Sequence, residues 1–274
     1  MKSTTKLQNE TKEIWDTKVK SLSLQGNFLE ILQSSETDLN WKSLMYNLPR
    51  NVLQFMMNSA INTLPTNSNL VRWKKRSSPG CNLCGNRETL MHTLNNCKTM
   101  LDDGRYTWRH NSVLDSIVSK LKSTLPESDK LSYDLPGHLV GISTMPTDIL
   151  ITNLKPDIVI SNYETKSVTL VELTVPFDEN ILAANTRKKK RYETLINDIQ
   201  EKGFTVKLYA IEISSRGYIS PDNLKRLKSL MNSISAKQFR EFRLSLQKIA
   251  IICSYCIFYS KFERGWIDPP LVSV

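Results

Sequence analysis

The chain has 274 residues and a mass of 31.4 kDa, enough for two compact domains, each with its own core. Its content of 40% hydrophobic and 23% charged residues is ordinary for a soluble globular protein, and three of its five cysteines are clustered, which argues against a disulfide framework and for a reducing compartment. The formal net charge of +10 indicates an anionic partner, most commonly nucleic acid.

Residues 1–43 are polar and mixed in charge, and we expect one helix near residues 12–22. Without an apolar core, the first residues do not predict a signal peptide. The longest apolar run, residues 249–259, is too short to cross a bilayer, and its Cys253 and Cys256 are expected to be buried. The sequence therefore predicts an intracellular, nuclear protein with no membrane partner.

Residues 44–125 are predicted to form a helical linker. Apolar residues recur in it at helical spacing and should pack on a neighbour: Leu53, Phe55, Met56, Ala60 and Leu64, and later Val113, Ile117, Val118 and Leu121. Between these runs lies the basic stretch "RWKKR", with Arg72, Lys74, Lys75 and Arg76. We interpret it as a surface that contacts nucleic-acid phosphates; the alternative is a solvated basic helix end.

A compact metal-binding pattern follows directly, in residues 81–97 of the linker. Its spacing is C-x2-C-x7-H-x4-C, and its ligands are Cys81, Cys84, His92 and Cys97. These four ligands suit a tetrahedral, structural Zn²⁺ that folds a loop and performs no chemistry. Gly85 permits the turn behind the first pair, and residues 88–94 are expected to form a helical turn. The alternative is a set of unrelated buried thiols.

A turn-rich connector with two prolines, around residues 125–138, marks the expected domain boundary, and His138 falls in this loop. Beyond it, residues 135–274 predict an α/β sandwich. Short β-branched runs ("DILI", "KPDIVISN", "SVTLVELTVPF", "TVKLYAIEIS") predict strands, a helix is expected over residues 179–203, and two more over 222–233 and from 237 onward.

Two carboxylates stand on otherwise apolar strands of this domain, where an unpaired charge is costly to bury. Asp157 lies in "KPD" and Glu172 in "VELT", and the short connection "NYETKS" between them permits a hairpin that brings them together. Converging carboxylates predict a Mg²⁺ site able to polarise a phosphodiester and activate water. The alternative is a structural ion pair with Lys155.

The next helix carries a cationic run, "RKKKR". Lys188 falls on the helix's apolar stripe between Ala184 and Tyr192, so we expect it beside the carboxylates, with Arg191 close by. The remaining basic residues are expected to attract DNA, although a nuclear-localisation run or a solvated face is an equal alternative. These are Arg187, Lys189 and Lys190.

These residues, in this order, resemble the C-terminal part of proteins encoded by non-LTR retrotransposons that carry a restriction-like endonuclease and insert at fixed sites such as ribosomal RNA genes. The resemblance spans residues 45–215 and rests on "LPRNVLQFMMNSAINTLPTNSNLVRWKK", the C-x2-C-x7-H-x4-C knuckle, "GRYTWRHNSVL", "KPDIVI", "VELTVPF" and "RKKKRYE".

The resemblance implies a PD-(D/E)xK-type nuclease after the zinc knuckle. Its lysine is not two residues after the second acid, where Thr174 stands, but on the next helix in a K-x-x-K-Y arrangement. That assigns Lys188 and Tyr192, with Arg191 in place of the second lysine. Spacing and resemblance together favour His92 over His110 as the zinc ligand and leave His110 for a phosphate contact.

The expected activity is a Mg²⁺-dependent DNA endonuclease that nicks double-stranded target DNA to prime reverse transcription. No polymerase F/Y-x-D-D stretch occurs in the chain, so the resemblance implies an upstream polymerase domain in the full-length protein, with element RNA as a second possible partner. Two alternatives remain open: a zinc-stabilised nucleic-acid-binding module that no longer cleaves, and a nuclease relative that acts on branched DNA.

Overall fold

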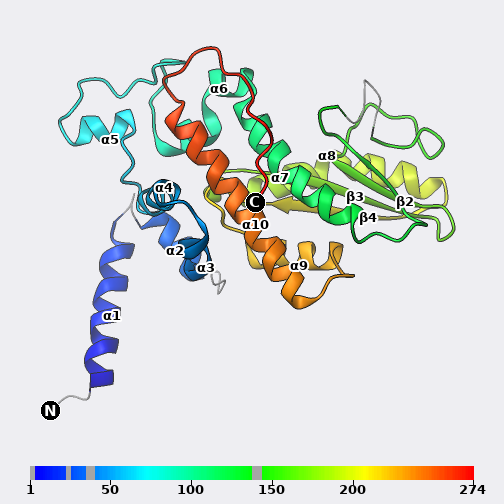
Figure 1. The fold of residues 1–274 in the computed structure, drawn as a ribbon, viewed down its shortest axis with the longest axis horizontal. Coiled ribbons are helices and arrows are strands. Elements are labelled where there is room, and N and C mark those ends of the chain that lie inside the picture. The colour runs from blue at the N-terminus through cyan, green and yellow to red at the C-terminus, as the bar shows by residue number, and fades with distance from the viewer. Residues whose placement is uncertain (1–3, 23–25, 35–40, 138–143) are drawn as a thin grey trace.

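The computed structural model of the protein describes residues 4–22, 26–34, 41–137 and 144–274, so His138 lies outside the described residues. Helices α1 to α5 form the N-terminal part, and α1 projects away from the body of the molecule (Figure 1). The helix predicted near residues 12–22 corresponds to α1, which spans Thr4–Lys20 and so begins earlier than predicted. The sheet and its helices make up the opposite end (Figure 1).

The remaining elements follow in chain order. They are α2 (Asn27–Ser34), α3 (Trp41–Asn47), α4 (Arg50–Ala60), α5 (Asn67–Arg72), η1 (His92–Asn96), α6 (Lys98–Asp102), α7 (Arg105–Lys122), β1 (Lys130–Tyr133), β2 (Ile158–Asn162), β3 (Ser167–Thr174), η2 (Asp178–Asn180), α8 (Ile181–Glu201), β4 (Thr205–Glu212), α9 (Pro221–Leu230) and α10 (Ala236–Tyr259).

Within the described residues the fold is mixed α/β, with a four-stranded sheet in the order β1-β2-β3-β4. Strands β2 and β3 form the predicted hairpin, in which Ile158 pairs with Val171. Strand β4 is parallel to β3, so the chain crosses over through α8, as a parallel connection requires. The helices predicted over residues 179–203, 222–233 and from 237 onward correspond to α8, α9 and α10.

Two local predictions were wrong. The "DILI" run is a turn, because the backbone N–H groups of Ile149 and Leu150 both donate to the carbonyl of Pro146. The turn-rich connector contains strand β1, which pairs antiparallel with β2, and Lys122 covers the ring of Tyr133 at 4.6 Å. Prolines on both sides of a short strand hide its alternation in the sequence.

Helices cover both faces of the sheet. On one face, apolar residues of β2 and β3 pack against Tyr192, Leu195 and Ile199 of α8. The other face packs against α7, α9 and α10, and the predicted stripe of α7, with Val113 and Ile117, is buried there. Cys81 and Cys97 join this second cluster, so one continuous core links the zinc segment, α7 and the sheet.

Helix α10 is apolar because it is buried on two sides. Ile249, Cys253 and Ile257 face α7 and the sheet, whereas Ile251 and Phe258 pack against α4. The helix has 24 residues and contains an 18-residue window with a mean hydropathy of 1.2, so by length and composition it could span a bilayer, and the length argument based on residues 249–259 was too narrow. However, 56% of this window is buried within the fold, as in a core helix.

Two buried ion pairs join the N-terminal helices to the C-terminal part. Arg216 pairs with Asp178 at 2.5 Å and donates to the carbonyl of Ser59 on α4 at 3.0 Å. Lys261, just beyond α10, pairs with Glu88 at 2.7 Å and also donates to the carbonyl of Pro65. All four charged side chains are at most 4% exposed, so these pairs constrain how the two parts meet.

Candidate functional site

The four predicted zinc ligands converge on one point. The ligand atoms of Cys81, Cys84, His92 and Cys97 all lie within 4.8 Å of one another. The Cys81 and Cys97 sulfurs are 3.9 Å apart, and Cys84 Sγ is 3.3 Å from His92 Nε2. A tetrahedral Zn²⁺ with Zn–S bonds of about 2.3 Å needs sulfurs roughly 3.8 Å apart. The cluster fits the ion, and these residues form a Zn²⁺ site.

Local backbone bonds shape the first ligand pair. The N–H of Cys81 donates to the carbonyl of Asn86, and that of Gly85 donates to the carbonyl of Cys81. Gly85 has φ +79°, a conformation that glycine adopts without strain, as expected for the turn behind the knuckle. The second pair is spaced by η1, a π-helical turn that starts at His92, somewhat later than the helical turn predicted over residues 88–94.

Tyr106 on α7 holds the second ligand pair in place. Its hydroxyl lies 3.0 Å from the carbonyl of Thr93 and 3.2 Å from that of His92, and it accepts from the N–H of Cys97 at 3.1 Å. Burial raises the pKa of the Cys97 thiol to about 12 and lowers that of His92. Without a cation, these residues therefore remain a neutral thiol and a neutral imidazole.

The two predicted carboxylates also meet. Extending the β2–β3 register by one residue places Asp157 opposite Glu172, and Asp157 Oδ2 accepts the N–H of Leu173 at 2.7 Å. Burial, and then the Asp157 charge, raise the pKa of Glu172, while Lys188 opposes this shift. Glu172 is 3% exposed, and its Oε2 is buried without a hydrogen-bond partner.

Lys188 lies where its helical stripe predicts, with its ammonium group paired to Glu172 Oε1. Tyr192, on the same stripe, is fully buried and donates to the carbonyl of Lys155 at 3.1 Å. Arg191 is exposed, and its guanidinium lies 5.8 Å from the Tyr192 ring centroid, so it stands apart from the carboxylates. Among the described residues, no ion pair joins Lys155 to either carboxylate.

His110 contacts this site, although the sequence left it for a phosphate. Its Nε2 lies 3.3 Å from Asp157 Oδ2, and its Nδ1 lies 3.2 Å from Asn111 Oδ1. Burial acts to lower the pKa of His110, but the Asp157 charge, the hydrogen bonds to Asp157 and Asn111, and the Glu172 charge together outweigh burial, and the pKa is raised. The only sequence signal was a histidine in "GRYTWRHNSVL", 47 residues before Asp157.

A cleft of about 720 Å³ opens beside these residues, with His110 and Lys188 in its lining. One wall comes from the zinc segment through Asn95 and Asn96, and the others come from α7, the end of β3 and the start of α8. Buried polar atoms around it lack a hydrogen-bond partner, namely Asn95 Oδ1, Arg109 Nε and Thr174 Oγ1. Such atoms favour a polar occupant or ordered water.

The predicted basic residues divide between the cleft and the outer surface. Arg187 lines the cleft, whereas Lys189 and Lys190 are exposed on α8. At the end of α5, Arg72, Lys74, Lys75 and Arg76 are all exposed, and Arg76 donates to Asn82 within the knuckle at 2.9 Å. The "RWKKR" stretch is therefore an exposed surface that adjoins the zinc site.

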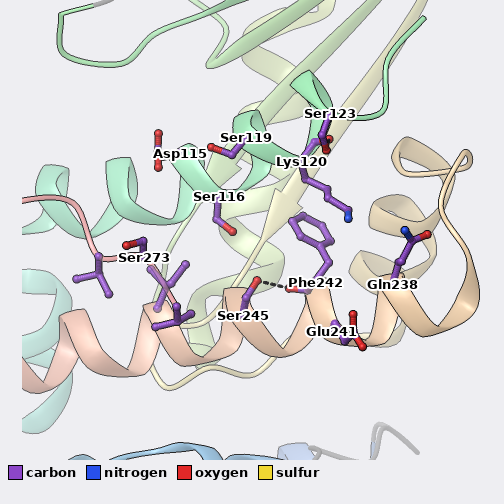
Figure 2. Close-up of a pocket in the computed structure, with 13 residues that line it drawn as sticks. Asp115, Ser116, Ser119, Lys120, Ser123, Gln238, Glu241, Phe242, Ser245 and Ser273 are labelled. Carbon is purple, nitrogen blue, oxygen red and sulfur yellow. Dashed lines mark hydrogen bonds between the residues drawn. The ribbon is translucent and has the colours of Figure 1, made fainter.

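A second cavity, of about 420 Å³, lies between the C-terminal half of α7 and the first half of α10 (Figure 2). Serines from both helices line it, and Phe242 and Lys120 lie between the helices (Figure 2). Its two acidic residues, Asp115 and Glu241, lie on opposite sides of the cavity (Figure 2), so it has no converging carboxylates. Within the described residues, the group of three or more potential ligands that could hold a metal ion is the cysteine and histidine cluster of the zinc site.

Fold and site together define a zinc-binding module packed on a mixed α/β body. A model of the zinc-binding domain in reverse transcriptases matches residues 23–102, which contain all four zinc ligands. Residues 23–102 are thus a zinc-binding module of the kind associated with reverse transcriptases. The match begins within the polar segment predicted over residues 1–43. No curated protein matches the chain.

Proposed function

We propose that this protein is a metal-dependent DNA endonuclease of the restriction-like type found in non-LTR retrotransposon proteins, and that it nicks double-stranded target DNA. The observation that carries the proposal is the convergence of Asp157, Glu172 and Lys188, from two adjacent strands and the following helix. A hairpin that presents two acids and a helix that presents a lysine correspond to the expected PD-(D/E)xK-type arrangement, with the lysine moved off the strand.

The carboxylate pair fits Mg²⁺. Glu172 Oε2 is a buried carboxylate oxygen with no partner, a costly arrangement unless a cation or water satisfies it. Asp157 supplies a second carboxylate close enough to raise the pKa of Glu172. Two carboxylates that leave room for waters and substrate phosphate are a usual Mg²⁺ environment. When bound, the ion would polarise the phosphodiester and increase the acidity of the attacking water.

The protein's own residues would bind and orient the substrate. Lys188, held beside Glu172, can orient the water or stabilise negative charge that develops on the phosphate. Arg187 lines the cleft and attracts the DNA backbone. Hydrolysis at this site would leave a 3′-hydroxyl to prime reverse transcription by a polymerase domain. The zinc module, which forms one cleft wall, would bind target DNA or element RNA. The protein would act in the nucleus.

Nicking of supercoiled plasmid by zinc-loaded protein with Mg²⁺ tests the proposal. We expect wild-type protein to convert supercoiled to open-circular DNA, and Asp157→Ala and Glu172→Ala to lose at least about 100-fold in rate because each removes a metal ligand. Asp222→Ala, which removes an exposed carboxylate on α9, is the control and should keep full activity. Nicking that persists in both site variants would come from a contaminant and would refute the proposal.

The exposed "RWKKR" surface beside the zinc site favours a second candidate, a nucleic-acid-binding module that does not cleave. Arg191 in place of the family's second lysine is consistent with this reading. Folded, zinc-loaded protein that binds DNA but never nicks it, with Mg²⁺ or Mn²⁺, would favour this candidate over the nuclease.

Either function predicts that Lys74→Ala/Lys75→Ala weakens nucleic-acid binding. The slope of log K against log salt is negative, and its magnitude should fall by about 0.9 for each phosphate that the protein no longer neutralises. The slope of the double variant should therefore be less steep by roughly 1.8. Fluorescence anisotropy over a salt series measures this slope. Lys225→Ala/Lys228→Ala removes the same charge from the exposed side of α9 and serves as the control. Equal slopes for the two variants would mean that only net charge matters.

A further inference from the structure

His110 and the backbone of β3 share one oxygen of Asp157. Leu173 donates its N–H to Asp157 Oδ2 at 2.7 Å, and His110 Nε2 lies 3.3 Å from the same atom. Asn111 engages the other ring nitrogen of His110 at 3.2 Å, which sets the ring orientation. Asp157 is therefore fixed from two elements that are distant in the sequence, α7 and β3.

These contacts decide which carboxylate oxygens remain available. In the described part of the chain, the hydrogen bonds to the Asp157 carboxylate all reach Oδ2, and none reaches Oδ1. Glu172 pairs through Oε1 with Lys188 and leaves Oε2 without a partner. Each acid thus keeps one oxygen free, and the free oxygen of Asp157 is set by the contacts that hold Oδ2.

Both ring nitrogens of the His110 imidazole already have a hydrogen-bond partner. Nε2 is directed at Asp157 and Nδ1 at Asn111, so neither lone pair nor N–H points to a separate ligand or substrate. A metal ligand or a general base needs a nitrogen that is free to react. A residue that hydrogen-bonds a ligating carboxylate instead orients it, and such contacts influence metal affinity.

We propose that His110 is a positioning residue, which holds Asp157 so that Oδ1 stays available to a divalent cation together with Glu172 Oε2. This role rests on the proposed nuclease site. It differs from the phosphate contact expected from the sequence, because His110 acts through Asp157.

Mn²⁺ binding, followed by electron paramagnetic resonance on zinc-loaded protein, tests this role without requiring catalysis. His110→Ala should weaken binding about 10- to 100-fold. His110→Gln keeps an N–H group that can reach Asp157 and should restore most of the affinity. Asn111→Ala, which frees the ring, should weaken it less than His110→Ala. Ser119→Ala, at an exposed position of the same helix outside this cleft, is the control and should bind as wild type does.

Each outcome separates the positioning role from the nuclease itself. If His110→Ala binds Mn²⁺ like wild type, or His110→Gln binds as weakly as His110→Ala, the positioning role is wrong. If these affinities follow the expected order but no plasmid is nicked, the positioning role stands and the nuclease proposal fails. If the Asp157→Ala variant binds Mn²⁺ as tightly as wild type does, both the positioning role and the nuclease proposal fail. Should His110→Ala fail to fold, the glutamine and Asn111→Ala variants decide the result.

Discussion

Removal of zinc is expected to unfold the zinc module and to destabilise the sheet packed against it. Cys97 is fully buried and Cys81 is 5% exposed, and both belong to the cluster that contains α7 and the sheet. Apparent binding free energies of structural Zn²⁺ are about 10–16 kcal/mol in small zinc-folded peptides, so most of this module's stability should depend on the ion. Thermal unfolding with and without a strong chelator, together with metal analysis, measures the effect.

A pair of variants separates zinc loss from loss of a buried thiol. Cys97→Ala and Cys253→Ala remove the same atom from positions that are both fully buried, but only Cys97 lies in the zinc cluster. Cys97→Ala should lower the zinc content, and its melting temperature should lie far below that of wild type. Cys253→Ala should keep about one zinc per chain and lose only a few kcal/mol at most. Equal zinc content and equal melting temperatures would contradict the assignment of Cys97 as a ligand.

The second large effect is expected at the buried Asp178–Arg216 pair. Asp178→Ala leaves the Arg216 guanidinium uncompensated between the rings of Phe28 and Phe177, at 3.9 and 4.3 Å from their centroids. Breaking a buried pair on one side costs about 3–5 kcal/mol, which corresponds to a melting-temperature decrease of roughly 6–20 °C. Denaturant unfolding followed by circular dichroism measures the loss.

Two further variants show whether the cost comes from the unpaired charge. Asp222→Ala breaks an exposed ion pair, in which the side chain of Lys225 is 80% exposed and that of Asp222 is 74% exposed. This change should cost at most about 1 kcal/mol. Adding Arg216→Met to Asp178→Ala removes the stranded charge and should recover part of the lost stability. A single Asp178→Ala variant as stable as Asp222→Ala would show that the pair does not hold the two parts together.

Local patterns in the sequence predict the zinc ligands and the position of Lys188. The four ligands fall within a short segment, so their spacing alone brings them together, and a 3.6-residue period places Lys188 on the face of α8 that carries Tyr192. The Asp157–Glu172 pair is nearly as local, because a short connection joins their strands. Their roles in catalysis stay a prediction.

Long-range packing explains what local patterns miss. Arg105 and Arg109 look like solvent-exposed or DNA-binding charges in "GRYTWRHNSVL", yet both are almost fully buried. Arg105 donates to the carbonyls of Ser260 and Glu263, beyond the end of α10, so its burial depends on residues about 155 positions away. His110 reaches Asp157 only because α7 packs against the sheet, and no periodicity within α7 reveals that contact.

We expect this protein to hold two different metal ions at separate sites. Anomalous X-ray diffraction from crystals soaked in Mn²⁺, with data above and below the zinc edge, tests this claim. We predict a zinc peak among Cys81, Cys84, His92 and Cys97, and a manganese peak between Asp157 and Glu172. Manganese density absent from the carboxylates at saturating Mn²⁺, or zinc density absent from the cysteines, would contradict the claim.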